Sequence, residues 1–191
     1  DSFIWSTNGT ESAQNLIMQY NIYDDSNQIL SHHKHLIHDI DFTPDGEKYI
    51  TASYDTTVKC WDIDTGLCVG TMQGFNSWIR SIAFSPDGQK CVLGSYDNSL
   101  KIWDVEKERC CKTLLGHEHW VRDIEFLNSG EKFISVSYDQ TLRIWEGKEP
   151  YQCQNVFKRH TKGISGVSCS KNGEYCVTAS YDGNVILWNF N

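Results

Sequence analysis

Residues 53–61 read Ser-Tyr-Asp-Thr-Thr-Val-Lys-Cys-Trp, and the pattern of a Ser-Tyr-Asp triplet followed by a tryptophan returns three times along the chain. The triplet recurs at residues 95–97, 137–139 and 180–182. A tryptophan follows each aspartate by six residues, at Trp61, Trp103, Trp145 and Trp188. The steps between these tryptophans are 42, 42 and 43 residues, and self-similarity at such a period indicates a repeat architecture.

Each repeat carries turn signals in a constant phase, and the segments between them are too short for helices. The turn ahead of the triplet is Pro44-Asp45-Gly46, Pro86-Asp87-Gly88, Asn128-Ser129-Gly130 or Asn172-Gly173. In the first full repeat, residues 38–42, 48–53 and 57–61 alternate as strands do, and 67–72 follows as a fourth strand. Four antiparallel strands per repeat predict an all-β fold built of β-propeller blades.

The period also predicts where the blades begin and end. The expected boundaries are 1–30 for a degenerate partial blade, 31–73, 74–115 and 116–158 for complete blades, and 159–191 for a C-terminal blade of three strands. In the partial blade we expect strands at 3–6, 16–22 and 28–31. The chain would then form about 4.5 blades of a partial ring.

The composition is that of a globular protein, with 39% hydrophobic and 22% charged residues. The net charge of −8 disfavours non-specific electrostatic binding to nucleic acid. No apolar run approaches the ~20 residues that a membrane-spanning helix requires. We therefore expect neither direct nucleic-acid binding nor a membrane anchor in this sequence.

Eight cysteines raise the question of disulfides. Cys60 stands where other repeats have Ile102, Ile144 and Leu187, and Cys91 and Cys176 stand where others have Tyr49 and Phe133. These positions suit small buried hydrophobic side chains, and no zinc-like spacing occurs. We therefore expect eight thiols and a reducing intracellular compartment, cytoplasmic or nuclear.

Repeats with Gly-His, then Ser-x-Asp, then Trp-Asp at these spacings resemble the WD-repeat β-propeller family over about residues 31–191. The resemblance implies a buried hydrogen-bond chain in each blade, from the Trp indole through the Ser hydroxyl and the His to the Asp. The residues that match are His33, Ser53, Asp55 and Trp61; Ser95, Asp97 and Trp103; His117, Ser137, Asp139 and Trp145; and His160, Ser180, Asp182 and Trp188. Phe75 replaces the histidine of the second repeat, so the hydrogen-bond chain should be interrupted in that blade. We expect Phe75→His to stabilise the blade.

The resemblance also implies a ring, most commonly of seven blades, whose missing outer strand comes from the N-terminal end of the same chain. We accordingly expect upstream sequence to complete the ring.

Ser, His and Asp together also raise the possibility of a hydrolase triad, but the same trio recurs in three repeats beside a core tryptophan, which favours a structural role. His32, His33, His35 and His38 lie in one segment, yet no Cys or carboxylate follows at ligand spacing. No glycine-rich phosphate-binding motif occurs. We expect no enzyme activity, no cofactor and no metal.

Partners of the family commonly dock on the face around the central channel. By resemblance, the residues that face it are Tyr54, Tyr96, Tyr138 and Tyr181 from the triplets, then His38, Arg80, Arg122 and Ser165, with Trp78 and Trp120 beside them. We expect Trp78, Arg80, Tyr96, Trp120, Arg122 and Tyr138 to converge on a site for an acidic or phosphorylated peptide. In the competing interpretation the tyrosines only pack on their neighbours and the arginines pair with acidic residues of their own chain.

The function that the residues favour is a non-enzymatic scaffold or adaptor, a subunit of a larger complex that binds protein partners. The alternative is a subunit of an RNA-processing or other nucleic-acid-associated complex. An enzyme on a propeller scaffold is a third possibility, but the sequence offers no reactive groups that are not already assigned to the blades.

Overall fold

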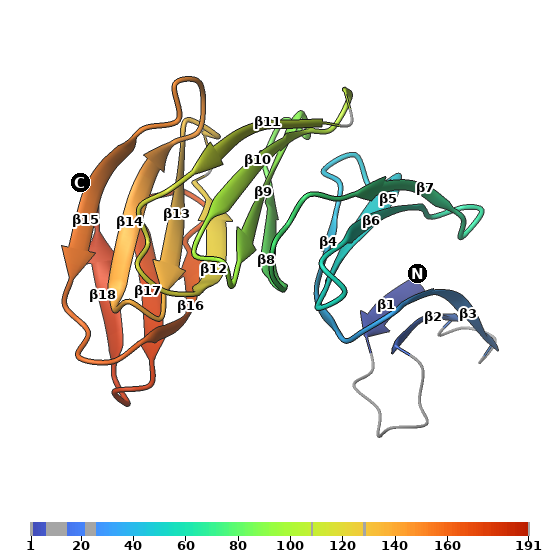
Figure 1. The fold of residues 1–191 in the computed structure, drawn as a ribbon, viewed down its shortest axis with the longest axis horizontal. Helices are drawn as coiled ribbons and strands as arrows, with labels where there is room; N and C mark the ends of the chain where they lie inside the picture. Colours follow the sequence, from blue (N-terminus) through green and yellow to red (C-terminus); the bar gives the residue numbers. More distant parts are fainter. Residues whose placement is uncertain (1, 7–14, 22–25, 108, 128, 191) are drawn as a thin grey trace. The chain divides into compact units, whose positions relative to one another are not determined.

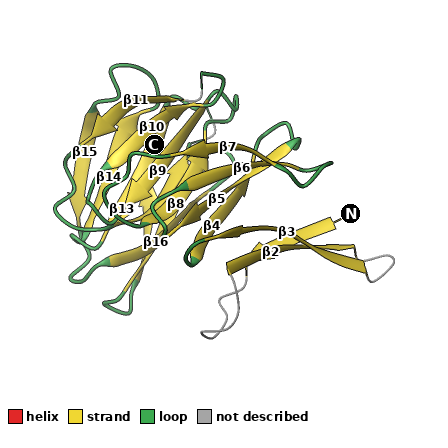
Figure 2. Cartoon of the chain, turned by 45° about the vertical axis from the view of Figure 1, so that its right-hand side comes forward, coloured by secondary structure: helices red, strands yellow, loops and turns green. Residues whose placement is uncertain are grey.

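The computed structural model describes residues 2–6, 15–21, 26–107, 109–127 and 129–190, and every regular element in them is a β-strand (Figures 1 and 2). No helix in these segments is long and apolar enough to cross a membrane. The predicted all-β class is confirmed.

The described strands form five antiparallel sheets, two of three strands and three of four, each a meander in chain order. The sheets are β1 (Ser2–Ser6), β2 (Asn15–Asn21) and β3 (Ser26–His33); β4 (Ile37–Phe42), β5 (Lys48–Ser53), β6 (Val58–Asp62) and β7 (Cys68–Met72); β8 (Ile79–Phe84), β9 (Lys90–Ser95), β10 (Leu100–Asp104) and β11 (Arg109–Leu114); β12 (Val121–Phe126), β13 (Lys132–Ser137), β14 (Thr141–Glu146) and β15 (Cys153–Lys158); and β16 (Ile164–Cys169), β17 (Tyr175–Ser180) and β18 (Val185–Asn189).

The turns between the first two strands of a sheet show why the sequence places glycine there. In the β8–β9 turn the Ser85 hydroxyl donates to the Asp87 carboxylate at 2.6 Å, and the Gln89 N–H donates to the same oxygen. Gly88 then adopts a φ of 70°, a conformation that residues with a Cβ rarely occupy. The repeated Pro-Asp-Gly signal therefore encodes a tight hairpin.

The chain divides into two compact units, residues 1–79 and 80–191. In the second unit the core lies between successive sheets. Val136 and Leu142 of the β12–β15 sheet pack with Ile164 and Val167 of the next sheet. Gly94 of β9 allows a close approach, because a Cβ there would lie 2.8 Å from Val121 of β12. Burial of these apolar faces holds the sheets together.

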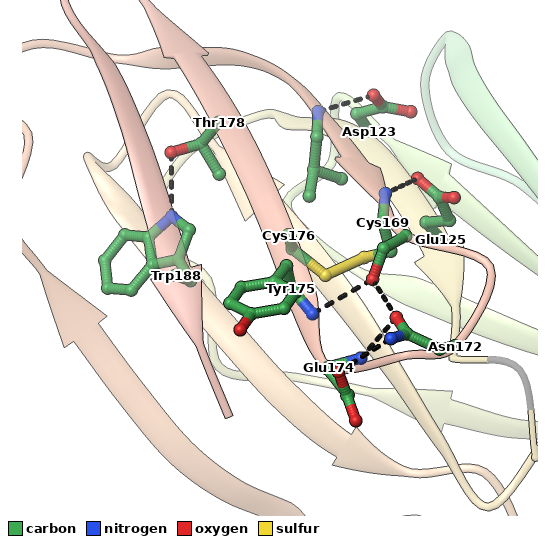
Figure 3. Close-up of a disulfide and its surroundings, with 11 residues drawn as sticks. Asp123, Glu125, Cys169, Asn172, Glu174, Tyr175, Cys176, Thr178 and Trp188 are labelled. Carbon is green, nitrogen blue, oxygen red and sulfur yellow. Dashed lines mark hydrogen bonds between the residues drawn. A yellow bond between two sulfur atoms is a disulfide. The ribbon is translucent and has the colours of Figure 1, made fainter. Parts of the chain in front are cut away.

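Two carboxylates of β12 add polar links between the sheets of the second unit. Asp123 accepts hydrogen bonds from the Ser81 hydroxyl at 3.1 Å and from the Val167 N–H at 2.9 Å, so it joins three successive sheets. Glu125 accepts from the Cys169 N–H at 3.0 Å (Figure 3). Burial raises the pKa of both carboxyl groups, and these hydrogen bonds partly oppose that rise.

The outward face of the last sheet is apolar and exposed. Val177 pairs with Leu187 across β17 and β18, and both side chains are exposed. The corresponding pair in the preceding sheet, Ile134 and Ile144, is buried. The expectation that a further blade covers such a face and completes a ring stays a prediction.

The prediction that all eight cysteines are thiols is wrong for one pair. Cys169 and Cys176 form a disulfide between β16 and β17 (Figure 3). The strand register places these two residues directly opposite each other, in the position where β12 and β13 pair Phe126 with Phe133. Six cysteines remain thiols, namely Cys60, Cys68, Cys91, Cys110, Cys111 and Cys153.

We predict that Asp123→Ala lowers the free energy of unfolding by about 2 kcal/mol or more, because it leaves the buried Val167 N–H without its acceptor. Urea denaturation followed by tryptophan fluorescence measures this change. Glu106→Ala, at an exposed position of the same unit, is the matched control and should have little effect. A loss for Asp123→Ala no larger than that of the control would show that this carboxylate does not hold the sheets together.

Candidate partner-binding surface

A buried chain of hydrogen bonds fixes the Ser-Tyr-Asp turn of the third repeat. The Trp145 indole N–H donates to the Ser135 hydroxyl at 2.8 Å, and Ser135 Oγ lies 2.6 Å from His117 Nε2. His117 Nδ1 lies 2.8 Å from Asp139 Oδ2. Because a carboxylate can only accept, the imidazole carries its proton on Nδ1 and accepts the hydroxyl proton at Nε2. Every polar atom in the chain then has a partner.

The first and last repeats contain the same chain. It comprises His33, Thr51, Asp55 and Trp61 in one and His160, Thr178, Asp182 and Trp188 in the other. Burial alone would raise the pKa of Asp139, but hydrogen bonds from His117 and Thr141 hold it well below its usual range. Burial lowers the pKa of His117, which keeps the imidazole neutral.

The predicted serines Ser53, Ser137 and Ser180 are not the hydroxyl members of these chains; Thr51, Ser135 and Thr178 are. Ser137 Oγ instead donates to the His119 carbonyl at 2.9 Å and accepts from the Asp139 N–H at 3.0 Å. The triplet serine therefore closes the turn, and the residue two positions earlier meets the tryptophan. Both belong to the same strand face, so alternation alone does not distinguish them.

These contacts leave no hydrolase geometry in the three repeats. Ser135, the hydroxyl that contacts an imidazole, is fully buried and is bonded to an indole as well. The hydroxyl of Ser137 is committed to backbone groups of its own turn. A nucleophile needs access to its substrate, and neither serine offers it.

The second repeat lacks two members of the chain. Phe75 replaces the histidine, and Leu93 stands at the hydroxyl position. Trp103 Nε1 is buried and has no hydrogen-bond partner among the described atoms. Asp97 accepts instead from the Ser99 hydroxyl, at 2.5 Å. The sequence of this repeat therefore lacks the hydroxyl as well as the histidine, and the expected effect of Phe75→His stays a prediction.

The triplet tyrosines lie against aromatic side chains from the following repeat. In the first unit Tyr54 stacks on Trp78, with ring centroids 4.2 Å apart and planes 8° apart. The ring centroid of His38 lies 4.9 Å from that of Tyr54, and the His35 ring also contacts Tyr54 and Trp78. In the second unit Tyr96 stacks on Trp120 in the same way, at 4.6 Å and 6°.

A continuous aromatic surface extends from this second pair. The ring centroids of Trp120 and Tyr138 lie 5.5 Å apart, and those of Tyr138 and Tyr181 lie 5.8 Å apart. Gly163 stands where Trp120 stands one repeat earlier, and the Tyr138 ring occupies the space that a Cβ of residue 163 would need. The residues Trp120, Tyr138 and Tyr181 are 38%, 41% and 51% exposed, so a partner can reach them.

Arg122 lies between two of these tyrosines. Its Nη1 donates to the Tyr96 hydroxyl at 2.6 Å and its Nη2 donates to the Tyr181 hydroxyl at 2.9 Å. The guanidinium also lies 5.9 Å and 5.8 Å from the centroids of the two rings. In the described part of the chain, no carboxylate forms a salt bridge with Arg122. We call Tyr96, Trp120, Arg122, Tyr138 and Tyr181 the aromatic rim.

Within the second unit, the structure brings Tyr96, Trp120, Arg122, Tyr138 and Tyr181 together. Tyr54, Trp78 and His38 lie in the first unit, and the Ser165 hydroxyl is bonded to the Ala179 carbonyl. Two residues that were not predicted also contact these surfaces, His35 and His119, and their shared His-x-His spacing in the sequence could have revealed them. Whether the rim binds a partner stays a prediction.

We predict that Phe75→His and Leu93→Thr are coupled. Leu93→Thr alone supplies the acceptor that Trp103 lacks but leaves the buried hydroxyl proton without the imidazole that accepts it in the other repeats, and Phe75→His alone places a polar ring in an apolar position. Together they supply both partners. In a double-mutant cycle measured by denaturation, the free energy of unfolding of the double variant should exceed the value expected from adding the two single changes by about 1 kcal/mol or more. Strict additivity would show that the second repeat cannot accommodate the chain.

We also predict that the cost of Asp139→Asn depends on pH. Because the folded-state pKa of Asp139 is depressed, its contribution is fully present above the unfolded pKa, usually 3.8, and is lost as the pH falls through the folded value. The loss in unfolding free energy should be about 2 kcal/mol near pH 6 and should shrink in acid. Thermal unfolding across pH tests this. Asp97→Asn, in the repeat without the histidine, should cost less; a pH-independent cost for Asp139→Asn would contradict the prediction.

The sequence model of the family described as WD domain, G-beta repeat matches residues 25–62, 66–104, 108–146 and 151–189. The chain is also similar to two fungal proteins. It is 38% identical over 48 residues to nuclear distribution protein nudF 1 of Talaromyces marneffei and 36% identical over 56 residues to nuclear distribution protein PAC1 of Arthroderma otae. Each alignment covers 25% of this chain but only 10% and 12% of the relative.

The solved structure of U3-55K superposes with a TM-score of 0.79 at 22% identity, over 85% of this chain and 51% of that one. The present chain thus spans about half of that protein, and the similarity at this identity shows the fold alone. Because the four matched segments together cover most of the sequence and fold as antiparallel blades, the chain belongs to the WD domain, G-beta repeat family.

Proposed function

We propose that this chain belongs to a non-enzymatic scaffold or adaptor that docks a protein segment on the aromatic rim. The observation that carries the proposal is the position of Arg122, a guanidinium held between two phenols without a carboxylate partner in the described residues. Exposed aromatic rings surround it. Tyr, Trp and Arg are the residue types that dominate binding energy at protein interfaces.

The chemistry of the rim favours an acidic or phosphorylated partner segment. A guanidinium pairs with a carboxylate or a phosphate through two parallel N–H bonds. The rings of Trp120 and Tyr138 offer rigid apolar area beside it, at little cost in conformational entropy. A net charge of −8 over the chain would discourage an anionic segment from binding elsewhere.

The same rings could also stack on the bases of a single-stranded nucleic acid, which is the competing function. The negative net charge disfavours it, because phosphate contacts need lysine and arginine along the whole path of the strand. The absence of a reachable nucleophile in the three hydrogen-bond chains supports a non-enzymatic role. The names of the fungal relatives, nuclear distribution proteins, support an intracellular scaffold in the cytoplasm or nucleus.

We predict that the double variant Arg80→Ala and Arg122→Ala binds the chief protein partner more weakly by about 2 kcal/mol or more, roughly 30-fold, because these guanidiniums anchor the partner. Partners captured from the native source are quantified for wild type and variant, with circular dichroism as the check on folding. Arg109→Ala, exposed on the outer strand β11, is the matched control and should leave capture unchanged.

Equal capture by wild type and double variant would place the docking site elsewhere on the blades. Binding of single-stranded RNA by the purified chain in a salt-dependent gel shift, lost in the same variant, would instead favour the nucleic-acid function.

A further inference from the structure

Tyr181 contributes to the rim in a way that differs from its neighbours. Its hydroxyl accepts a hydrogen bond from Arg122 Nη2 at 2.9 Å, and its side chain is half exposed. A phenol that accepts through its oxygen still has its own proton to donate. Arg122 uses one N–H on each Nη atom for the two phenols, which leaves one donor on each. This part of the rim therefore still has donors to offer a ligand.

A second arginine, Arg80, lies on the first strand of the preceding sheet, β8. The Ser81 hydroxyl of β8 donates to Asp123 of β12, which links these two strands in the second unit. Arg80 and Arg122 each precede one of these two residues. The positive charge of Arg80 partly opposes the rise that burial causes in the pKa of Asp123. The site itself combines the positive charge of Arg122 with a phenolic donor.

We propose that the anion bound at this site is a phosphate monoester on a side chain of the partner, and that Tyr181 is the positioning residue that selects it. The proposal rests on the function proposed above. The guanidinium fork takes one lone pair on each oxygen of a carboxylate, so the Tyr181 hydroxyl must share an oxygen with it, whereas a phosphate monoester offers the hydroxyl a separate third oxygen. A phosphate monoester has three terminal oxygens and carries nearly two negative charges at neutral pH, so it is attracted to the Arg122 guanidinium more strongly than a carboxylate is.

Immobilised degenerate peptide pools test the proposal. Three pools are identical except at one fixed residue, which is phosphoserine, glutamate or serine, and each is probed with the full chain at physiological salt. Wild type should retain the phosphoserine pool about tenfold more than either other pool, since a hydrogen bond to a charged group is worth roughly that factor or more. Equal retention of the phosphoserine and glutamate pools would overturn the assignment of phosphate.

Variants separate the role of Tyr181 from a merely structural one. Tyr181→Phe keeps the ring and should lose most of the preference for phosphoserine, with its unfolding temperature unchanged. Tyr175→Phe removes an exposed hydroxyl from the other end of β17 and should keep the full preference. An unchanged preference in Tyr181→Phe overturns the role of this residue.

The same pools distinguish the further inference from the proposed function. If Arg122→Ala abolishes capture of the native partner while the wild type shows no preference for phosphoserine, docking on the rim stands and the phosphate proposal fails. If Arg122→Ala leaves native capture intact, the proposed function itself fails.

Discussion

The buried chain from indole to hydroxyl to imidazole to carboxylate is the constraint on which this structure depends. It joins the third strand of a blade, the second strand, the segment that enters the blade and the turn that carries the triplet tyrosine. Each atom in it can donate or accept in only one consistent way, so the chain specifies a single arrangement. The second repeat lacks both the imidazole and the hydroxyl, and its Trp103 indole is left without a partner in the described structure. The family architecture is therefore maintained there by apolar packing instead.

From the turns, the constraint extends to the surface and to the neighbouring blades. Two consecutive residues of β12 have complementary roles at a register irregularity between Val121 and Asp123, where Arg122 is the extra residue of the strand. Asp123 bonds to the blades on both sides of its own, through Ser81 and Val167. Arg122 reaches the tyrosines of the same two blades, Tyr96 and Tyr181. A guanidinium already held in this way loses little freedom when a partner binds, which is how pre-organisation raises affinity.

Period, strands and blade type could be predicted from the sequence, because hydrophobic alternation and turn residues are local signals that four repeats reinforce. The hydroxyl of the buried chain was misassigned to Ser53 because the triplet is the repeated motif, whereas the true position holds Thr51, Leu93, Ser135 or Thr178. The strand register explains the outcome. Trp61 pairs with Tyr49, so Thr51 is its diagonal neighbour, while Ser53 lies four residues, ~13 Å, along the strand from Tyr49. The disulfide was missed for a related reason, since only the register shows that Cys169 faces Cys176. The contact of Arg122 with Tyr181, 59 residues later, depends on how successive blades pack and has no local signal.

Nitrogen-15 NMR of the arginine side chains tests most directly the claim that blade packing fixes a binding guanidinium. We expect slow rotation of the Arg122 guanidinium, seen as separately resolved Nη signals at low temperature, and faster rotation once Tyr181→Phe removes one phenolic acceptor. Averaged Nη signals in the wild type, like those of an exposed arginine such as Arg109, would show that the rim does not hold Arg122 in place and would contradict the account.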